Sequence, residues 1–212
     1  MKQYSLKDIR NVAVVGHGGV GKTSVAEGML FLSGVNDRLG KTGDTSSIMD
    51  YDLDEVDRGH SLSASIAFYE WKGCKVNLID IPGDSNFVAD TPACLRVIDG
   101  IVIVISAIDG VQFYTEKVWN WATEQSIPKI IFINKIDNEQ ADIKGTLDSI
   151  KRKFKLSPFS VHTNVGIGEK FTGMIDVLTK KLYSYKKDSS GINKCDVVPD
   201  EMIEDVSLSF AE

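Results

Sequence analysis

The stretch Gly16-His17-Gly18-Gly19-Val20-Gly21-Lys22-Thr23 lies between an apolar run, Ile9–Val15, and a segment whose apolar residues recur at helical spacing. It fits the pattern G-x-x-x-x-G-K-[ST], in which backbone N–H groups of a glycine-rich loop cradle phosphate at the start of a helix. The flanking runs predict a strand before the loop and a helix after it. We therefore expect a phosphate-binding strand–loop–helix unit near the N-terminus.

Two further motifs follow apolar, strand-like runs. Asp80-Ile81-Pro82-Gly83 comes first, and Asn134-Lys135-Ile136-Asp137 comes later in the chain. The Asp137 carboxylate can accept hydrogen bonds from the N1–H and the 2-amino group of guanine, a donor pair that adenine lacks. Taken singly, the three motifs have plainer interpretations as a helix start, a turn and a helix cap. In this order and at these strand ends, they indicate a guanine-nucleotide site.

The motifs also predict roles for individual residues. Lys22 is expected to place its ammonium group on the terminal phosphates, and Gly83 to offer its N–H to the γ-phosphate. Mg²⁺ is the expected metal, with the Thr23 hydroxyl as a direct ligand and Asp80 holding it through water. The residues predicted to bind GTP or GDP are His17, Gly18, Gly19, Val20, Gly21, Lys22, Thr23, Ser24, Gly83, Asn134, Lys135 and Asp137.

Composition limits the class of protein. The 212 residues carry a net charge of −6 and are 42% hydrophobic, which is ordinary for a soluble globular protein. This charge does not favour a broad contact with nucleic acid, and no direct DNA binding is expected. No apolar run approaches the roughly 20 residues that span a bilayer, and Met1–Arg10 is too polar for a signal peptide. The sequence predicts a cytoplasmic monomer without membrane contact, whose Cys74, Cys94 and Cys195 are reduced thiols.

Strand-like and helix-like segments alternate along most of the chain. This order predicts an α/β fold of the P-loop type, with three layers and a mostly parallel central sheet. Ligands bind such sheets at the carboxyl ends of the strands, where the three motifs lie. The segments expected after the first helix are the hairpin strands Ile66–Trp71 and Lys75–Ile81, helix Phe87–Ile98, strand Gly100–Ala107, helix Val111–Gln125, strand Lys129–Asn134 and helix Ala141–Phe154.

Two regions depart from this alternation. The segment from about residue 36 to 65 is rich in Gly, Asp, Thr and Ser, and we expect it to be long and mobile. After Pro158 come short strand-like pieces, followed by a helix start at Asp200–Glu212 that the chain end interrupts. We therefore predict a nucleotide-binding domain over residues 1–155 and the beginning of a second, α+β unit over residues 156–212.

The sequence resembles the G domain of elongation factor G, and most closely the elongation factor G-like paralogues among the translational GTPases. Besides the three motifs, the matching stretches are Asp57-Arg58-Gly59-His60-Ser61, Trp71–Asp80, Ser106–Gly110 and Ile167–Asp176. The resemblance implies a ribosome-stimulated GTPase, with Ser61 as a further Mg²⁺ ligand and the ribosome as partner. It also implies that residues 156–212 begin a subdomain inserted in the G domain, and that the chain is an N-terminal fragment. Such a fragment would lack the last guanine motif of the family, so we expect weak nucleotide affinity.

Several residues differ from the family pattern around the γ-phosphate. The family usually has Asp-Thr-Pro-Gly-His, and Asp84 here takes the place of the histidine that positions the attacking water. A carboxylate only accepts hydrogen bonds, and it adds negative charge beside a triphosphate. Gly18 and His60 stand where apolar residues are usual, and Gly19 replaces a common aspartate.

These differences leave two interpretations of Asp84. In the first, GTP hydrolysis is slow or lost, and the domain is a GTP-binding module that docks on the ribosome. In the second, His60 positions the water and Asp84 orients His60, so that both are catalytic as a His–Asp pair. A ribosome-protection or release factor with the same domain, and a P-loop ATPase, are the remaining alternatives.

Overall fold

The computed structural model describes residues 2–40, 46–50, 61–84, 90–184 and 194–197. The chain divides into two compact units, Met1–Asn134 and Lys135–Glu212. The predicted domain boundary after residue 155 stays a prediction. Among the described residues, no helix has both the length and the apolar character needed to span a bilayer.

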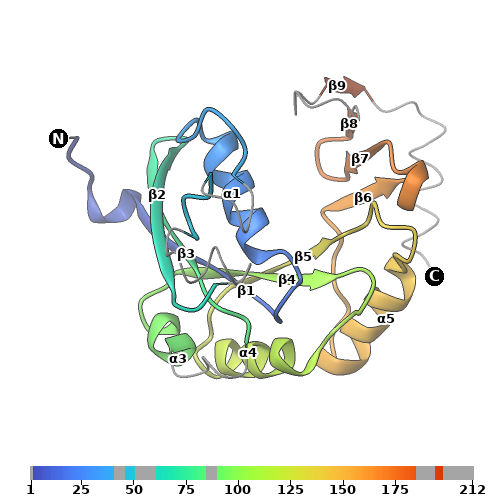
Figure 1. The fold of residues 1–212 in the computed structure, drawn as a ribbon, viewed down its shortest axis with the longest axis horizontal. Coiled ribbons are helices and arrows are strands. Elements are labelled where there is room, and N and C mark those ends of the chain that lie inside the picture. The colour runs from blue at the N-terminus through green and yellow to red at the C-terminus, as the bar shows by residue number, and fades with distance from the viewer. Residues whose placement is uncertain (1, 41–45, 51–60, 85–89, 185–193, 198–212) are drawn as a thin grey trace. The chain divides into compact units, whose positions relative to one another are not determined.

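The first unit is built around a five-stranded sheet (Figure 1). Its strands are β1 Ile9–Val15, β2 Ser65–Trp71, β3 Cys74–Asp80, β4 Gly100–Ser106 and β5 Lys129–Asn134. They lie in the order β2-β3-β1-β4-β5, with β2 antiparallel to β3 and all other neighbours parallel. This arrangement confirms the predicted mostly parallel sheet.

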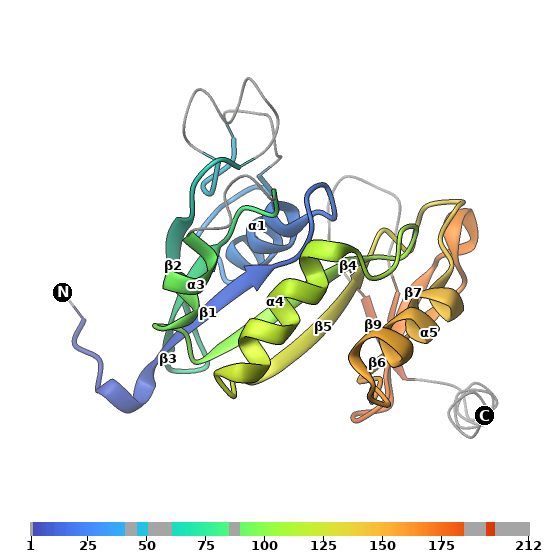
Figure 2. The ribbon, with the colours of Figure 1, turned by 90° about the horizontal axis from the view of Figure 1, so that it is seen from below.

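Helices cover both faces of this sheet. Figures 1 and 2 show α1 (Lys22–Leu32) on one face, and α3 (Asp90–Leu95) and α4 (Phe113–Glu124) on the opposite face. The first unit therefore has the three layers predicted for the α/β fold, and the predicted fold class is confirmed.

A cluster of buried apolar side chains joins α1 to the sheet. Its central members are Ala26, Leu30, Val14, Leu78 and Val104, all of them fully buried. Burying a Val or Leu side chain stabilises a fold by roughly 1.5–3 kcal/mol. The cluster therefore fixes α1, and with it the loop that precedes α1, against three strands of the sheet.

Helix α3 ends earlier than the sequence predicts. The predicted range is Phe87–Ile98, whereas the helix spans Asp90–Leu95, and residues 85–89 lie outside the described part. Just beyond its end, the N–H groups of Arg96 and Val97 bond to carbonyls three residues back, at 3.3 and 3.1 Å. Such a tightened turn replaces the α-helical pairing and ends the helix early.

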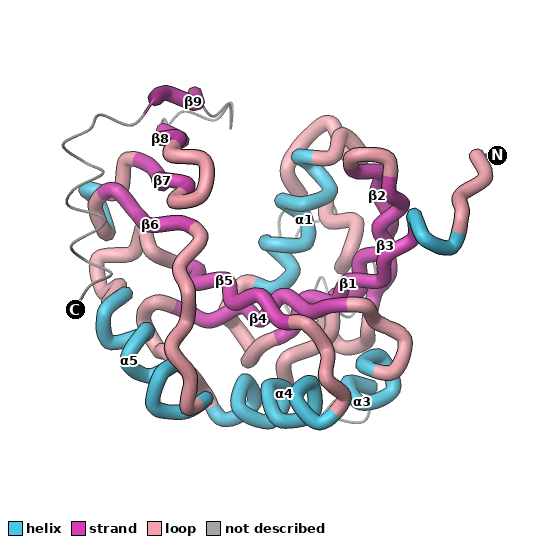
Figure 3. Tube along the Cα trace, turned by 180° about the vertical axis from the view of Figure 1, so that it is seen from behind, coloured by secondary structure: helices cyan, strands magenta, loops and turns pink. Residues whose placement is uncertain are grey.

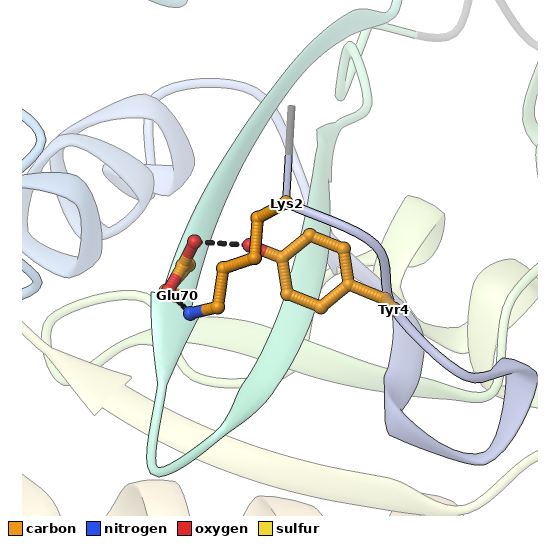
Figure 4. Close-up of polar contacts among 3 residues, drawn as sticks. All are labelled: Lys2, Tyr4 and Glu70. Carbon is orange, nitrogen blue, oxygen red and sulfur yellow. Dashed lines mark hydrogen bonds and ion pairs between the residues drawn. The ribbon is translucent and has the colours of Figure 1, made fainter.

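The N-terminal segment contacts the edge strand β2 (Figure 4). Lys2 forms an ion pair with Glu70, and the Tyr4 hydroxyl donates to the same carboxylate. The hydrogen bond from Lys2, followed by that from Tyr4, lowers the pKa of Glu70 below its ordinary value. Because Lys2 and Glu70 are exposed, this contact contributes little to stability.

In its described residues, the second unit combines one α-helix and one 3₁₀ helix with a small antiparallel sheet, drawn in Figure 3. Helix α5 spans Ile143–Phe154, and a 3₁₀ helix, η3, spans Gly168–Lys170. The strands pair in chain order and are β6 His162–Val165, β7 Gly173–Asp176, β8 Lys181–Ser184 and β9 Lys194–Val197. These elements confirm the predicted change to short strands after Pro158. The helix predicted at Asp200–Glu212 lies outside the described residues.

Candidate functional site

The loop Gly16–Gly21 connects the carboxyl end of β1 to the first turn of α1. Gly16 and Gly21 have φ values of 147° and 91°, in the region that favours glycine. A side chain on Gly16 would overlap the Val104 carbonyl of β4, and one on Gly21 would overlap the Asn134 amide at the end of β5. The loop therefore lies close against the strand ends. The first N–H groups of α1, which have no intrahelical partner, are available to an anion held there.

Lys22 is the buried cation of the site. Its side chain is 7% exposed, and its Nζ donates to the His17 carbonyl of the loop at 2.9 Å. Burial lowers the pKa of Lys22, and the negative charges of Asp80 and Asp50 oppose that shift. A Cβ on Gly83 would overlap the same Nζ. The ammonium group thus lies between the loop and the turn that follows β3, where the terminal phosphates are predicted.

Hydroxyl and carboxylate oxygens converge next to Lys22. The Thr23 hydroxyl donates to Asp80 Oδ2 at 2.6 Å and lies 3.2 Å from the Ser61 hydroxyl. Ser61 in turn donates to Asp50 Oδ1 at 2.7 Å. The second carboxylate oxygen of Asp80, Oδ1, is buried and has no hydrogen-bond partner among the described residues. Oxygens of this kind are the ligands that Mg²⁺ prefers, so Thr23, Ser61 and Asp80 fit this ion.

The charge of Asp80 gives a second indication of a cation. Its carboxyl group is fully buried, and this burial raises the pKa of Asp80 to about 6 despite the Thr23 hydrogen bond and the Lys22 charge. An ionised carboxylate in this position has lost its hydration, and a bound cation would replace it. The buried, unpartnered Oδ1 therefore fits a bound cation at neutral pH.

This raised pKa predicts that Mg²⁺ binding depends on pH. In the metal-free fold, the pKa of Asp80 is about 6, against an ordinary value of 3.8. Between these two pH values the folded state binds the proton that the unfolded chain has lost, so the folded state loses stability as the pH rises from about 4 to about 6. Mg²⁺ must displace that proton. Its affinity for the nucleotide-bound protein is therefore expected to be about tenfold lower at pH 5 than at pH 7.

Mg²⁺ titration at both pH values, followed by nucleotide fluorescence, measures this difference. The Asp80→Asn variant serves as the control, because its Mg²⁺ affinity still changes with pH through titration of the nucleotide phosphates but not through residue 80. The same pH dependence in both proteins would contradict the role of Asp80.

Two buried acidic residues near this site, Asp50 and Glu27, are absent from the sequence-based prediction. Glu27 lies on α1, and its Oε1 accepts hydrogen bonds at 2.7, 2.6 and 2.9 Å from the Ser47 hydroxyl and the N–H groups of Ile48 and Met49. The sequence signal for Glu27 is a carboxylate within the apolar run of α1. These contacts join residues 46–50 to the helix, and the Met49 side chain is buried in the core.

The segment predicted to be mobile thus contains a well-packed portion. Residues 46–50 end at Asp50, whose carboxylate accepts a hydrogen bond from the Ser61 hydroxyl. The Ser61 hydroxyl lies beside that of Thr23. Residues 41–45 and 51–60 lie outside the described part, so the mobility of the whole segment from about residue 36 to 65 stays a prediction.

Replacing Glu27 with alanine is expected to lower the free energy of unfolding by about 3–5 kcal/mol, because three donors lose their buried acceptor. Urea denaturation measures the loss. Glu124→Ala, at the exposed end of α4, is the matched control and is expected to change stability by less than about 0.5 kcal/mol. Equal losses in the two variants would show that Glu27 does not hold residues 46–50.

The third motif begins at the carboxyl end of β5. Asn134 Nδ2 donates to the Val20 carbonyl at 2.9 Å and so joins the end of β5 to the phosphate loop. Lys135 adopts a left-handed conformation, with φ at 61°, and Asp137 is exposed in the loop that follows. Both belong to the second compact unit, and their contact with the base stays a prediction.

The other residues predicted to bind nucleotide differ in burial. Val20 packs in the core beside Val104, and His17 is half-buried. Gly18, Gly19 and Ser24 are exposed on the loop and the first turn of α1. The exposed positions are those at which backbone N–H groups can face a bound phosphate.

The predicted catalytic pair is only partly visible. Asp84 is half-buried directly after Gly83, at the turn that contacts Lys22. His60 lies outside the described residues, so the His60–Asp84 pair stays a prediction.

The arrangement of motifs on the sheet defines a class of protein. A phosphate loop joins β1 to α1, an Asp-x-x-Gly turn follows β3, and an Asn-Lys-x-Asp loop follows β5. Together with the parallel order β3-β1-β4-β5, these features define a P-loop guanine-nucleotide-binding domain.

The family model of the elongation factor Tu GTP binding domain matches residues 7–209. The chain belongs to this family, and it is a GTP-binding domain of the kind found in translational GTPases related to elongation factor G. The resemblance seen in the sequence is confirmed.

Individual relatives agree with this membership. The chain is 34% identical to elongation factor G of Mycoplasma genitalium over 99% of this chain and 30% of that protein. It is 34% identical to elongation factor G 2 of Desulfotalea psychrophila, over 89% of this chain and 27% of that protein. It is also 37% identical to the mitochondrial ribosome-releasing factor 2 of Danio rerio, over 83% of this chain and 23% of that protein.

A solved structure supports the fold as well. A crystal structure of a Thermus thermophilus protein matches 94% of this chain and 30% of its own chain, with a TM-score of 0.83 and 30% identity. The present chain thus spans less than a third of the length of the relatives it matches.

Proposed function

We propose that this chain binds GTP with Mg²⁺ and, as part of an elongation factor G-like protein, hydrolyses GTP when that protein acts on the ribosome. The observation that carries the proposal is the convergence of Lys22, Thr23 and Asp80 at the ends of β1 and β3, with one Asp80 oxygen buried and unpartnered among the described residues. The names of the relatives, two elongation factors and a ribosome-releasing factor, support the ribosome as partner.

Each group of the site has a task in this proposal. Lys22 and the loop N–H groups hold the phosphates, and the Gly83 N–H adds a donor for the γ-phosphate. Thr23, Ser61 and Asp80 hold Mg²⁺, which neutralises phosphate charge when bound. Asp137 selects guanine, and Asn134 and Lys135 support its loop, as the motif predicts.

Asp84 decides between hydrolysis and binding alone. As a carboxylate, Asp84 can orient water by accepting a hydrogen bond, but it cannot place positive charge beside the γ-phosphate. This residue therefore favours a second candidate function, a hydrolysis-deficient GTP-binding module that docks on the ribosome. The cytoplasmic location and monomeric state stay predictions, and one relative is named as mitochondrial.

Replacing Asp84 with histidine is expected to raise the single-turnover rate of GTP hydrolysis with ribosomes by about tenfold or more, because an imidazole can donate a proton or carry positive charge. Quench-flow measurement on the intact protein tests this, with Asp148→His on the exposed face of α5 as the matched control. An unchanged rate would show that Asp84 does not limit hydrolysis.

The same assay separates the two candidate functions. GTP binding without hydrolysis in either protein would favour the binding-only module. A His60→Ala variant as fast as the unmodified protein would contradict the His60–Asp84 pair.

A further inference from the structure

The 3₁₀ helix η3 contacts the loop that carries Asp137. The backbone N–H of Gly168, the first residue of η3, donates to the carbonyl of Ile136 at 2.9 Å. Both residues belong to the second compact unit. The peptide group that accepts this hydrogen bond links Ile136 to Asp137, so the contact fixes the backbone immediately before the predicted base-binding carboxylate.

Gly168 is required for this close approach. It is buried, and its φ of 61° lies in the left-handed region, where a side chain costs energy. A Cβ at this position would lie 3.2 Å from the Asn138 carbonyl oxygen and 3.3 Å from the Glu139 Cα. Both are backbone atoms of the same loop and cannot rotate away. Any other residue at position 168 would therefore have to move the backbone of this loop by a few tenths of an ångström.

The turn that carries Gly168 is itself held firmly. The Gly168 carbonyl accepts from the Phe171 N–H at 3.0 Å, and the Ile167 carbonyl accepts from the Lys170 N–H at 3.2 Å. The Thr172 N–H donates to the Val165 carbonyl at 2.9 Å, which ties the turn to the end of β6. The donor of Gly168 is thus fixed relative to the antiparallel sheet of β6 to β9.

The recognition loop has its own constraints as well. Lys135 is left-handed, and its carbonyl accepts from the Asn138 N–H at 3.2 Å, which closes a turn around Ile136 and Asp137. Within this turn, the Ile136 carbonyl points to Gly168. The backbone immediately before Asp137 is therefore held by a hydrogen bond from a residue about 30 positions further along the chain.

We propose that Gly168 is a positioning residue for guanine recognition: through Ile136 it aligns Asp137 with the N1–H and 2-amino groups of the base. This inference rests on the proposed binding of guanine nucleotide. By reciprocity, a base held by Asp137 stabilises the η3 turn, so the antiparallel sheet is coupled to nucleotide binding.

A comparison of GDP with inosine diphosphate tests the alignment. Inosine diphosphate lacks the 2-amino group, so the ratio of the two affinities reports how well Asp137 meets the base. In the intact protein, Gly168→Ala is expected to weaken GDP binding about tenfold. It is also expected to lower the ratio of GDP affinity to inosine diphosphate affinity by a similar factor. Gly73→Ala is the matched control, because Gly73 also has a positive φ, 86°, but no atom within 4 Å of its Cβ position.

A folded Gly168→Ala protein that prefers GDP to inosine diphosphate by the same factor as the unmodified protein would overturn the inference. This holds even if the variant is less stable or binds both nucleotides more weakly. Hydrogen exchange of the unmodified protein provides a test that needs no variant. GDP is expected to slow exchange of the Gly168 amide more than inosine diphosphate does, at equal saturation, and equal protection would overturn the proposal. If the unmodified protein does not prefer GDP to ADP, the proposed function fails first, and that result is distinct from either outcome for Gly168.

Discussion

Replacing Asp137 with asparagine is expected to lower the affinity of the intact protein for GTP by about a thousandfold or more. The asparagine amide cannot accept two hydrogen bonds from the guanine N1–H and 2-amino groups, so a donor of the base is left unpaired. The same amide can donate to the 2-oxo group of xanthine, and XTP binding is therefore expected to appear in the variant. Competition titration with a fluorescent guanine nucleotide measures both changes.

The matched control for this substitution is Asp148→Asn on the exposed face of α5, which makes the same chemical change away from the site. It is expected to leave the affinities for GTP and XTP unaltered. Equal GTP affinity in the Asp137→Asn variant and in this control would show that the Asn134–Asp137 loop does not read the base.

The second large effect is expected from Lys22→Ala, which should weaken GTP binding by about a hundredfold to a thousandfold. The Lys22 ammonium is almost fully buried and lies against Gly83 and the His17 carbonyl. Its removal takes the Lys22 charge away from the phosphates and from Asp80, and truncating one member of a buried charge pair costs roughly 2–5 kcal/mol of binding free energy.

Lys117→Ala provides the control for this prediction, because Lys117 lies over the Phe113 ring on α4, where it serves no phosphate. Isothermal titration with GTP in the presence of Mg²⁺ distinguishes the two variants. Similar affinities would contradict the assignment of Lys22 to the terminal phosphates.

The sequence predicts those parts of the fold that local chemistry determines. The apolar run before Gly16 and the Gly-Lys-Thr start of α1 predict a strand, a loop and a helix, and all three are found where expected. The hairpin around Lys72-Gly73 is also found, since positive φ values of 48° and 86° allow the two-residue turn between β2 and β3.

Long-range contacts could not be predicted in the same way. Glu27 is a buried acceptor because residues 46–50 fold back onto α1. Its place in an apolar run indicates burial, but the sequence does not indicate which segment supplies the donors. The pairing of Gly168 with Ile136 likewise depends on the antiparallel sheet that places η3 against the recognition loop. The end of α3 depends on hydrogen bonds three residues back, which sequence periodicity does not report.

In the candidate site as well, the sequence predicts the residues that belong to motifs and misses a residue that long-range contacts bring in. The motifs predict Lys22, Thr23 and Asp80 as a phosphate and metal site, and the structure brings these three residues together. Asp50 escapes prediction because it lies in a polar segment without strand or helix periodicity. Its contact with Ser61 connects that segment to the site.

Competition between GTP and ATP for the intact protein, measured with and without Mg²⁺, tests the central claim most directly. A fluorescent GDP bound to the protein is expected to be displaced by GTP at low concentration, more readily with Mg²⁺, and to resist a thousandfold excess of ATP. Displacement by ATP as readily as by GTP, or an affinity for GTP that Mg²⁺ leaves unchanged, would contradict a magnesium-dependent guanine-nucleotide site in this domain.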